Sequence, residues 1–382
     1  MKVKEKQLKI KICFVSILGY PLYNKKCTRQ FFGGGAGVQL YILSKELANN
    51  PKFDVHVITG NYNLTPNKIE TIGNMFLHNL RPFKRKISFY FLSLLNLFIY
   101  FIRINPDIII QRQAEKVTGI CAFYCKLFKK KFLFSIANLH DVNGELEKGF
   151  FGKFYKYGLE NANHIIAQNN EQIKTLEKLK KKKIENISIL KSSYKINLLE
   201  KKNKKYILWV GRAIDWKRPE LFIKLAEMFS DKKFLMICNK SDEKQRNLKY
   251  WSAIKDKASK ISNLEFIEYV PFHNINAYFE AAEIFINTSI YEGFPNTFIQ
   301  SSLFGTPIIS LNVNPDGILT KNKIGLWCEN NFDLMVKNLN LLLDNDELYL
   351  SFSENCYNFV KKNHNINKNV DKWIQIINNV LK

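Results

Sequence analysis

Short apolar runs, rich in β-branched residues, alternate with helical patterns along most of the chain. In the amino-terminal half, helical patterns cover residues 38–47 and 87–102 and the stretch around Cys121. Continuous apolar strands separated by helices are typical of a parallel sheet with both faces covered. We expect the strands of this half at residues 10–18, 54–59, 108–110, 132–137, 165–168 and 187–190.

The pattern restarts after a lysine-rich stretch, residues 191–205, which we interpret as an interdomain linker. A second doubly wound sheet follows, so the sequence predicts an α/β protein whose two parallel-sheet domains, 1–195 and 206–360, face each other across a cleft. Ligands of such folds bind in the crevice, which is the expected site. Helices are expected at 219–229 and 296–304, and strands at 206–210, 234–237, 264–266, 283–287 and 307–310.

The last residues form an amphipathic helical pattern. Trp373, Ile377 and Val380 fall on one face at helical spacing. Such a stripe must dock on another surface. We expect residues 361–382 to pack back on the amino-terminal domain.

Length and charge set broad limits on the function. The 382 residues exceed the usual size of one hydrophobic core, and 58 basic against 34 acidic side chains give a net charge of +24. This excess favours an anionic partner, such as phosphate groups, nucleic acid or an acidic membrane surface. Lysine runs such as 180–183 are more typical of solvated surface. Basic residues interleaved with aromatics, which would indicate nucleic-acid binding, are not found.

The seven cysteines indicate reduced thiols in a cytosolic protein. Their odd number and their scatter through apolar stretches do not fit a disulfide framework. Cys121 and Cys125 could share a helix face, but no histidine cluster completes a metal site beside them, so we interpret both as core thiols.

Two segments bear on targeting. Residues 10–18 are too short and too rich in strand formers for an export signal. Residues 87–102 are apolar and follow a basic segment, residues 81–86, but they fall short of the about 20 residues that a membrane-spanning helix needs. A buried or interfacial helix is the favoured interpretation, and contact with an anionic bilayer stays open.

Two basic residues follow the first strand of the second domain. Arg212 and Lys217 come directly after residues 206–210 and a turn at Gly211. Ligands bind at the carboxyl ends of parallel strands. A guanidinium and an ammonium that converge on a diphosphate would stabilise its growing charge as it leaves.

A second element follows a later strand. Glu292 lies in a loop, the sequence Gly293-Phe294-Pro295 is typical of a tight turn, and Asn296 or Thr297 is expected to cap the next helix. The helix start would bind phosphate through backbone N–H groups, and Glu292 would accept hydrogen bonds from sugar hydroxyls.

Together these motifs resemble retaining glycosyltransferase family 4. The resemblance rests on Val210-Gly211-Arg212 with Lys217, on residues 292–297 (Glu-Gly-Phe-Pro-Asn-Thr), on residues 305–307 (Gly-Thr-Pro) and on the glycine loop at residues 33–39. It covers essentially the whole chain. It implies a GT-B fold, that is, two Rossmann-like domains, and a nucleotide-sugar donor.

The resemblance also implies roles for individual residues. Arg212 and Lys217 would hold the donor diphosphate, and Glu292 would contact the transferred sugar. The family usually has a second glutamate eight residues later, where this chain has Gln300, whose amide can still bond a ribose hydroxyl. The remaining donor-binding residues that it implies are Gly34, Gly35, Val270, Gly293, Phe294, Pro295, Asn296 and Thr297.

A histidine after the fourth core strand completes the candidate set. His140 follows residues 132–137, where similar enzymes place a histidine near the reacting sugar; it could also be a loop histidine that bonds local backbone. Asp141 is a weaker candidate.

No obligatory metal is expected. Asp344-Asn345-Asp346 spells a metal-binding motif of another glycosyltransferase fold, but it lies after a helical run and reads as a helix end and cap. The resemblance implies instead that the cations and the helix terminus neutralise the diphosphate. It also implies transfer with retention, in which the leaving phosphate oxygen takes the acceptor's proton on the same face of the sugar.

The sequence leaves the substrates open. UDP- or GDP-sugars carrying a hexose or N-acetylhexosamine are the favoured donors. A glycan or lipid-linked acceptor of surface polysaccharide or lipopolysaccharide assembly is the favoured acceptor, which places the enzyme in the cytoplasm or on the inner face of the membrane. Three alternatives stay open: a nucleotide-sugar 2-epimerase, a basic nucleic-acid-binding protein, and a silent scaffold.

Overall fold

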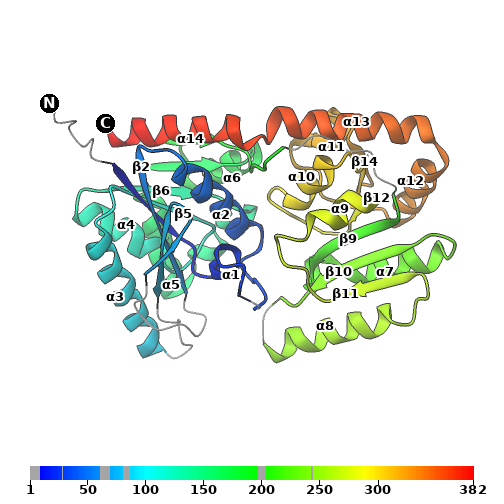
Figure 1. The fold of residues 1–382 in the computed structure, drawn as a ribbon, viewed down its shortest axis with the longest axis horizontal. Helices are drawn as coiled ribbons and strands as arrows, with labels where there is room; N and C mark the ends of the chain where they lie inside the picture. The colour runs from blue at the N-terminus through cyan, green and yellow to red at the C-terminus, as the bar shows by residue number, and fades with distance from the viewer. Residues whose placement is uncertain (1–8, 28, 61–68, 81–86, 197–203, 242–243) are drawn as a thin grey trace. The chain divides into compact units, whose positions relative to one another are not determined.

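The chain folds into two α/β units. The computed structural model describes residues 9–27, 29–60, 69–80, 87–196, 204–241 and 244–382. The first unit comprises residues 1–193 and 366–382, and the second comprises residues 194–365 (Figure 1). The basic segment 81–86 and residues 197–203 of the expected linker lie outside the described residues.

The first unit contains an eight-stranded sheet in the order β3-β4-β2-β1-β5-β6-β7-β8. Every neighbouring pair is parallel except the edge pair β3–β4, which is antiparallel. The pattern does not predict this edge pair, which turns at Gly73 with φ of +57°. The strands are β1 Ile10–Val15, β2 Phe53–Gly60, β3 Ile69–Ile72, β4 Met75–Leu80, β5 Ile108–Arg112, β6 Lys131–Ser135, β7 His164–Ala167 and β8 Ile187–Ile189.

Helices cover both faces of this sheet. The helices α3, α4 and α5 pack over one apolar cluster that includes Phe101, Cys121 and Phe134, while α2 lies against β2 and contacts α14 on the other face (Figure 1). The helices are α1 Tyr20–Tyr23, α2 Gly34–Ala48, α3 Ile87–Ile104, α4 Thr118–Leu127, α5 Gly149–Glu160, α6 Asn170–Lys180 and α14 Ile366–Leu381, with short 3₁₀ turns η1 Leu139–Asp141 and η2 Glu145–Glu147.

The apolar stretch at residues 87–102 is a helix with one buried face. Leu94, Leu97 and Phe101 of α3 are buried in the core. Among the described helices, none combines the length and the apolar character that crossing a membrane requires.

The second unit contains a six-stranded, fully parallel sheet in the order β11-β10-β9-β12-β13-β14. Two parallel-sheet α/β domains are therefore present, which confirms the predicted fold class. The strands are β9 Tyr206–Arg212, β10 Phe234–Asn239, β11 Leu264–Ile267, β12 Ala282–Asn287, β13 Ile308–Ser310 and β14 Gly325–Trp327.

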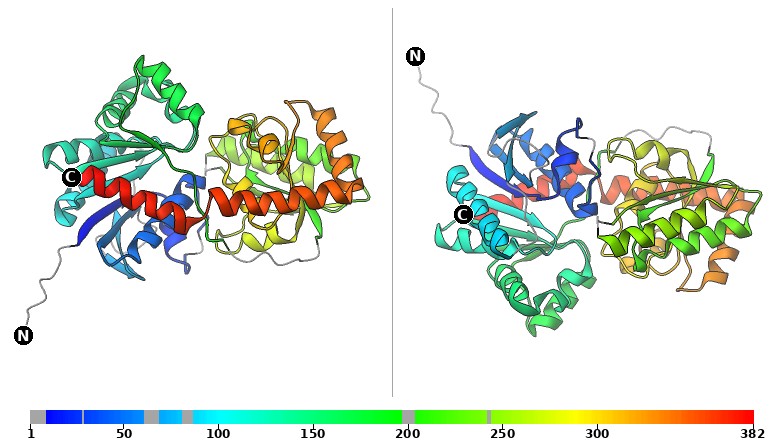
Figure 2. Two further views of the ribbon diagram at one scale, coloured as in Figure 1. Left: turned by 90° about the horizontal axis from the view of Figure 1, so that it is seen from above. Right: turned by 90° about the horizontal axis from the view of Figure 1, so that it is seen from below.

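Two apolar clusters hold helices to the two faces of this sheet. α7, α8 and α12 pack on one face, and α9, α10, α11 and α13 pack on the other (Figure 2). The elements are α7 Pro219–Met228, α8 Gln245–Ala258, α9 Asn276–Ala281, α10 Asn296–Leu303, α11 Ile318–Lys321, α12 Phe332–Asp344 and α13 Asp346–Asn363, with 3₁₀ turns η3 Asp215–Lys217 and η4 Pro315–Gly317.

The Asp-Asn-Asp sequence lies at a helix junction. Asp344 ends α12, and the Asn345 side chain accepts a hydrogen bond from the backbone N–H of Leu348 at the start of α13. The predicted helix end and cap are confirmed.

The carboxyl-terminal segment does not form one continuous helix. α13 ends at Asn363 and α14 begins at Ile366. α14 belongs to the first unit, where Trp373 and Ile377 are buried and the Asn369 amide donates to the Ser193 hydroxyl at 2.8 Å.

Candidate functional site

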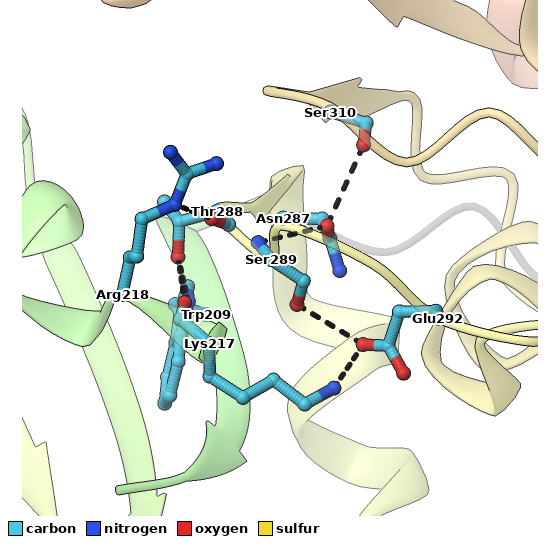
Figure 3. Close-up of polar contacts among 8 residues, drawn as sticks. All are labelled: Trp209, Lys217, Arg218, Asn287, Thr288, Ser289, Glu292 and Ser310. Atoms are coloured by element: carbon cyan, nitrogen blue, oxygen red, sulfur yellow. Dashed lines mark hydrogen bonds and ion pairs between the residues drawn. The ribbon is translucent and has the colours of Figure 1, made fainter. Parts of the chain in front are cut away.

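An ion pair lies where two loops of the second unit meet at the carboxyl ends of β9 and β12. Lys217 follows β9 in η3, and Glu292 follows β12 in the loop that leads to α10. The Lys217 Nζ donates to the Glu292 Oε1, and Figure 3 shows the two side chains pointing toward one another. Both side chains are only 18% exposed. Strands β9 and β12 are neighbours in the sheet, which is why residues far apart in sequence meet here.

A buried hydroxyl joins the two loops. Thr288 Oγ1 accepts from Trp209 Nε1 at 2.9 Å and donates to the carbonyl of Lys217 at 2.5 Å (Figure 3). The backbone N–H of Ile290 also donates to the Trp216 carbonyl at 2.7 Å. These bonds fix the backbone on both sides of the ion pair.

Ser289 orients the glutamate. Its hydroxyl donates to Glu292 Oε1 at 3.0 Å, the same oxygen that Lys217 contacts. Within the described part of the chain, Glu292 Oε2 accepts no hydrogen bond. The carboxylate is therefore held on one side and keeps acceptor capacity on the other.

Two arginines accompany the pair. Arg212, the last residue of β9, is half-buried. Arg218, which the sequence analysis did not single out, adopts the left-handed conformation with φ of +47°. Its Nε donates to the Thr288 carbonyl and its Nη1 to Asn330 Oδ1, both at 2.8 Å. Burial lowers the pKa of the Arg218 guanidinium from its usual value. Arg218 thus connects the loops that contain Thr288 and Asn330.

The start of α10 differs from the prediction. Pro295, with ψ of 120°, is the residue before the first turn, and Asn296 is already helical. Pro295 occupies the N-cap position and makes no side-chain cap hydrogen bond, so neither Asn296 nor Thr297 is the cap residue. The extended conformation that proline readily adopts supplies the helix entry in place of a polar cap. The helix dipole and backbone N–H groups at such an end attract anions.

Three other predicted donor-binding residues of this unit, Gln300, Val270 and Phe294, are buried or half-buried. Gln300 is buried on α10, and Val270 is buried in the cluster that contains Ile275 and Phe279. Phe294 is half-buried, with its ring 5.0 Å from that of His364. Because its side chain is buried, Val270 could contact a ligand only through its backbone.

An aromatic pair flanks the ion pair. The rings of Trp216 and Tyr291 stack with an interplanar angle of 13° and centroids 5.8 Å apart. Each precedes one partner of the ion pair in sequence, and both are exposed. The predictions did not include them, although their positions next to Lys217 and Glu292 are a sequence signal.

In the first unit the glycine loop forms the beginning of a helix. α2 starts at Gly34, with φ of +59°, and not at residue 38 as expected. A Cβ at Gly33 or Gly37 would lie 2.5 or 2.7 Å from the Phe31 ring, so any other residue there would require this ring to move. Gly35 lies in the first turn of the helix.

His140 lies in η1, after β6. Its Nδ1 lies 2.7 Å from Glu145 Oε2, which orients the imidazole, and the side chain is 34% exposed. Its neighbour Asp141 is buried, and its Oδ2 accepts from the backbone N–H groups of Ala137 and Asn138 at 2.7 and 3.2 Å. Burial raises the pKa of the Asp141 carboxyl. Asp141 therefore holds the loop that carries His140.

The match to a known family lies almost entirely in the second unit. Residues 191–359 match the family model of glycosyl transferases group 1. An uncharacterized glycosyltransferase of Haemophilus influenzae is 30% identical over 56% of the chain and 60% of its own length. Poly(ribitol-phosphate) alpha-N-acetylglucosaminyltransferase of Staphylococcus aureus is 24% identical over 61% of the chain and 48% of its own length. The chain thus matches only about half to three fifths of these relatives.

A solved structure shares the fold over nearly the whole chain. HepE from Anabaena, in complex with UDP, superposes with a TM-score of 0.69 at 12% identity, and the match covers 97% of this chain and all of that one. The shared architecture is the GT-B fold of two parallel-sheet α/β domains.

Proposed function

We propose that this chain, whose residues 191–359 form a glycosyl transferases group 1 domain, is a retaining glycosyltransferase of family 4. It would move a hexose or N-acetylhexosamine from a nucleotide-diphosphate sugar to a glycan or lipid-linked acceptor. The observation that carries the proposal is the Lys217–Glu292 pair, held at the carboxyl edge of the second sheet beside the start of α10.

Lys217 and Arg212 would bind the diphosphate. An ammonium has three N–H donors, so Lys217 can keep Glu292 and still donate to a phosphate oxygen. The uncapped start of α10, with Gly293 to Thr297, adds dipole and backbone N–H donors to the same anion. Charge that develops on the leaving diphosphate is stabilised by groups already in position, which lowers the barrier to transfer.

Glu292 would bind the sugar. Its Oε2 lies on the side away from Lys217 and Ser289 and can accept hydrogen bonds from sugar hydroxyls. In the same proposal Gln300 bonds the ribose and the Val270 backbone contacts the base.

Residues of the first unit would contact the donor where the sugar is transferred. We assign His140, oriented by Glu145, to the transferred sugar, and the backbone of Gly34 and Gly35 to close approach on the diphosphate. Retention follows if the leaving phosphate oxygen removes the acceptor's proton on the same face. In that case no second carboxylate need lie opposite the bond, in contrast to glycosidases.

The substrates are proposed at the level of class. HepE was solved with UDP, which favours a UDP-sugar, with a GDP-sugar as the other candidate donor. The Staphylococcus relative is named for a polymer acceptor, which fits surface polysaccharide assembly. Lipopolysaccharide assembly is the other candidate, and the positive net charge fits it as well. We place the protein in the cytoplasm, peripheral to the inner face of the membrane.

Nucleotide release tests the proposal. UDP-, GDP-, ADP- and CMP-sugars are incubated with the wild type, with Lys217→Ala and with Lys337→Ala, an exposed lysine of α12, all in EDTA. We expect one donor to be turned over by the wild type and by Lys337→Ala, and at least tenfold more slowly by Lys217→Ala. Equal turnover by both variants would overturn the assignment of Lys217.

Stereochemistry tests the finer part of the proposal. With the donor identified, proton NMR of the product gives the anomeric configuration. A retained anomer supports the mechanism and an inverted one contradicts it. Free nucleotide together with a C2-epimerised sugar, formed without acceptor, would favour the epimerase.

A further inference from the structure

Helix α3 is apolar on two opposite faces. Its inward face, with Leu94, Leu97 and Phe101, belongs to the core. Its outward face carries four apolar side chains at helical spacing, namely Leu92, Leu95, Ile99 and Ile102, which are 40–61% exposed. A helix on the surface of a water-soluble domain normally has a polar outer face. The outer face of α3 therefore requires a separate explanation.

The neighbouring helix extends this surface. Phe123 and Leu127 of α4 and Phe128, which ends it, are also exposed. The Phe98 ring joins the two helices, because its centroid lies 6.1 Å from those of both Phe123 and Phe128. Figure 1 shows α3 and α4 next to each other on one side of the first sheet. We call these seven exposed residues of α3 and α4 the apolar face.

The charged residues of α3, of α4 and of the segment that follows α4 are all basic. Arg103, Lys126 and Lys129 are exposed, and residues 87–104 and 118–131 contain no aspartate or glutamate. Lys126 donates to an uncharged partner, Asn161 Oδ1. The nearest acidic side chain on the connecting segment, Asp107, is paired with Lys130. A contiguous apolar surface with basic residues at its rim matches an anionic lipid headgroup layer over acyl chains.

We infer that the apolar face of α3 and α4 docks this protein on an anionic lipid surface. The apolar side chains enter the boundary between headgroups and acyl chains, and Arg103, Lys126 and Lys129 lie at the level of the phosphates. The inference deepens the proposed function, since it rests on the peripheral membrane location given there, and it identifies the surface responsible.

The charge rim favours this occupant over a second copy of the chain. In a symmetric dimer through the apolar face, the basic rim of one copy would lie near that of the other, with no acidic residue of α3 or α4 to offset the repulsion. A bilayer with anionic lipids supplies the opposite charge.

Vesicle flotation tests the inference. The wild type is mixed with vesicles of phosphatidylcholine alone or with about one third phosphatidylglycerol. Two further proteins are compared: Leu95→Glu with Ile99→Glu, which changes the apolar face, and Leu341→Glu with Leu350→Glu, which changes two exposed leucines of the second unit. We expect the wild type and the second variant to float with anionic vesicles, and the first variant to bind at least tenfold more weakly.

A charge variant provides a second reading that leaves apolar packing untouched. Arg103→Gln with Lys126→Gln should weaken binding to anionic vesicles about 25-fold, at roughly fivefold for each basic side chain near the surface, and should reduce the salt dependence of binding. Thermal melting of all variants checks that they fold.

The outcomes separate the possible partners. Failure of the wild type to bind anionic vesicles, or equal loss in the control variant, would overturn the inference. So would a dimer in analytical ultracentrifugation that Leu95→Glu with Ile99→Glu dissociates. Vesicle binding is measured without a nucleotide-sugar donor, so it is independent of the activity. If the protein turns over a nucleotide sugar but does not bind vesicles, only the docking surface is refuted and the proposed activity stands.

Discussion

Thr288 shows how one side chain positions the candidate site. It is fully buried, and its single hydroxyl serves both the Trp209 indole and the Lys217 backbone. Thr288 and Trp209 are not among the motif residues, yet the position of Lys217 relative to Glu292 depends on this bridge. The motif residues contact the substrate in our proposal, and Thr288 acts as a positioning residue through the backbone of Lys217.

Replacing this hydroxyl should destabilise the second unit. Thr288→Val keeps the shape but leaves the buried Trp209 N–H and the Lys217 carbonyl without this partner, which costs about 1–3 kcal/mol. Urea unfolding measures the loss. The control is Thr320→Val, an exposed hydroxyl, for which we expect a change within about 0.5 kcal/mol. Equal effects of the two substitutions would show that the bridge has no energetic role.

At the scale of elements, strong periodicity was the reliable guide. Buried strands such as β1, β5, β9 and β12 carry short apolar runs of strand length, which favour strands over the longer apolar run that forms α3. The edge strand β3 was not predictable in this way, because it is short and its Ile69 is exposed. Composition predicts the first residue of a helix poorly where backbone geometry determines it. The glycine-rich sequence gives no signal that α2 begins at Gly34, and at α10 Pro295 stands where a polar cap is expected.

Some features of the candidate site can likewise be predicted from the sequence, and others cannot. Sequence motifs predict which residues follow the ends of β9 and β12. The contacts between these residues depend on the strand order, which places β9 beside β12. These contacts are the Lys217–Glu292 pair, the hydrogen bond from Arg218 to the Thr288 carbonyl, and the stacking of Trp216 on Tyr291. Strand order is a tertiary property, and motif spacing does not contain it.

A histidine pair across two strands should make the first unit sensitive to acid. His56 of β2 and His78 of β4 lie 2.9 Å apart, Nδ1 to Nε2, and such a hydrogen bond needs at least one neutral ring. Burial, followed by the neighbouring His56, lowers the pKa of His78 to about 4. Burial also lowers the pKa of His56, which Asp54 partly opposes and Lys11 slightly reinforces.

The direction in which the stability changes with pH follows from proton binding. The unfolded chain, with a histidine pKa of about 6.5, binds more protons than the folded chain between about pH 6.5 and 4, so stability falls as the pH drops through this window. From pH 7.5 to pH 5 His78 should contribute a loss on the order of 2 kcal/mol. Urea unfolding of wild type and His78→Gln measures it: the variant should lose less stability over this range, and parallel curves would contradict the assignment.

At the scale of the whole molecule, a net charge of +24 acts in two separate places. In the second unit, Arg212 and Lys217 concentrate positive charge at a sheet edge that we assign to the donor. In the first unit, basic residues surround the apolar face of α3 and α4. The two surfaces can be tested independently, because we assign a nucleotide to one and a lipid layer to the other.

The account depends most on the donor site. Isothermal titration calorimetry of UDP and GDP with the wild type, Lys217→Met and the control Lys337→Met tests it most directly. The account predicts that the wild type and the control bind one of these nucleotides with similar affinity. Lys217→Met should bind about 10- to 100-fold more weakly, the effect of losing a charged hydrogen bond of about 1.5–3 kcal/mol. Equal binding by Lys217→Met, or no binding of either nucleotide by the folded wild type, would contradict it.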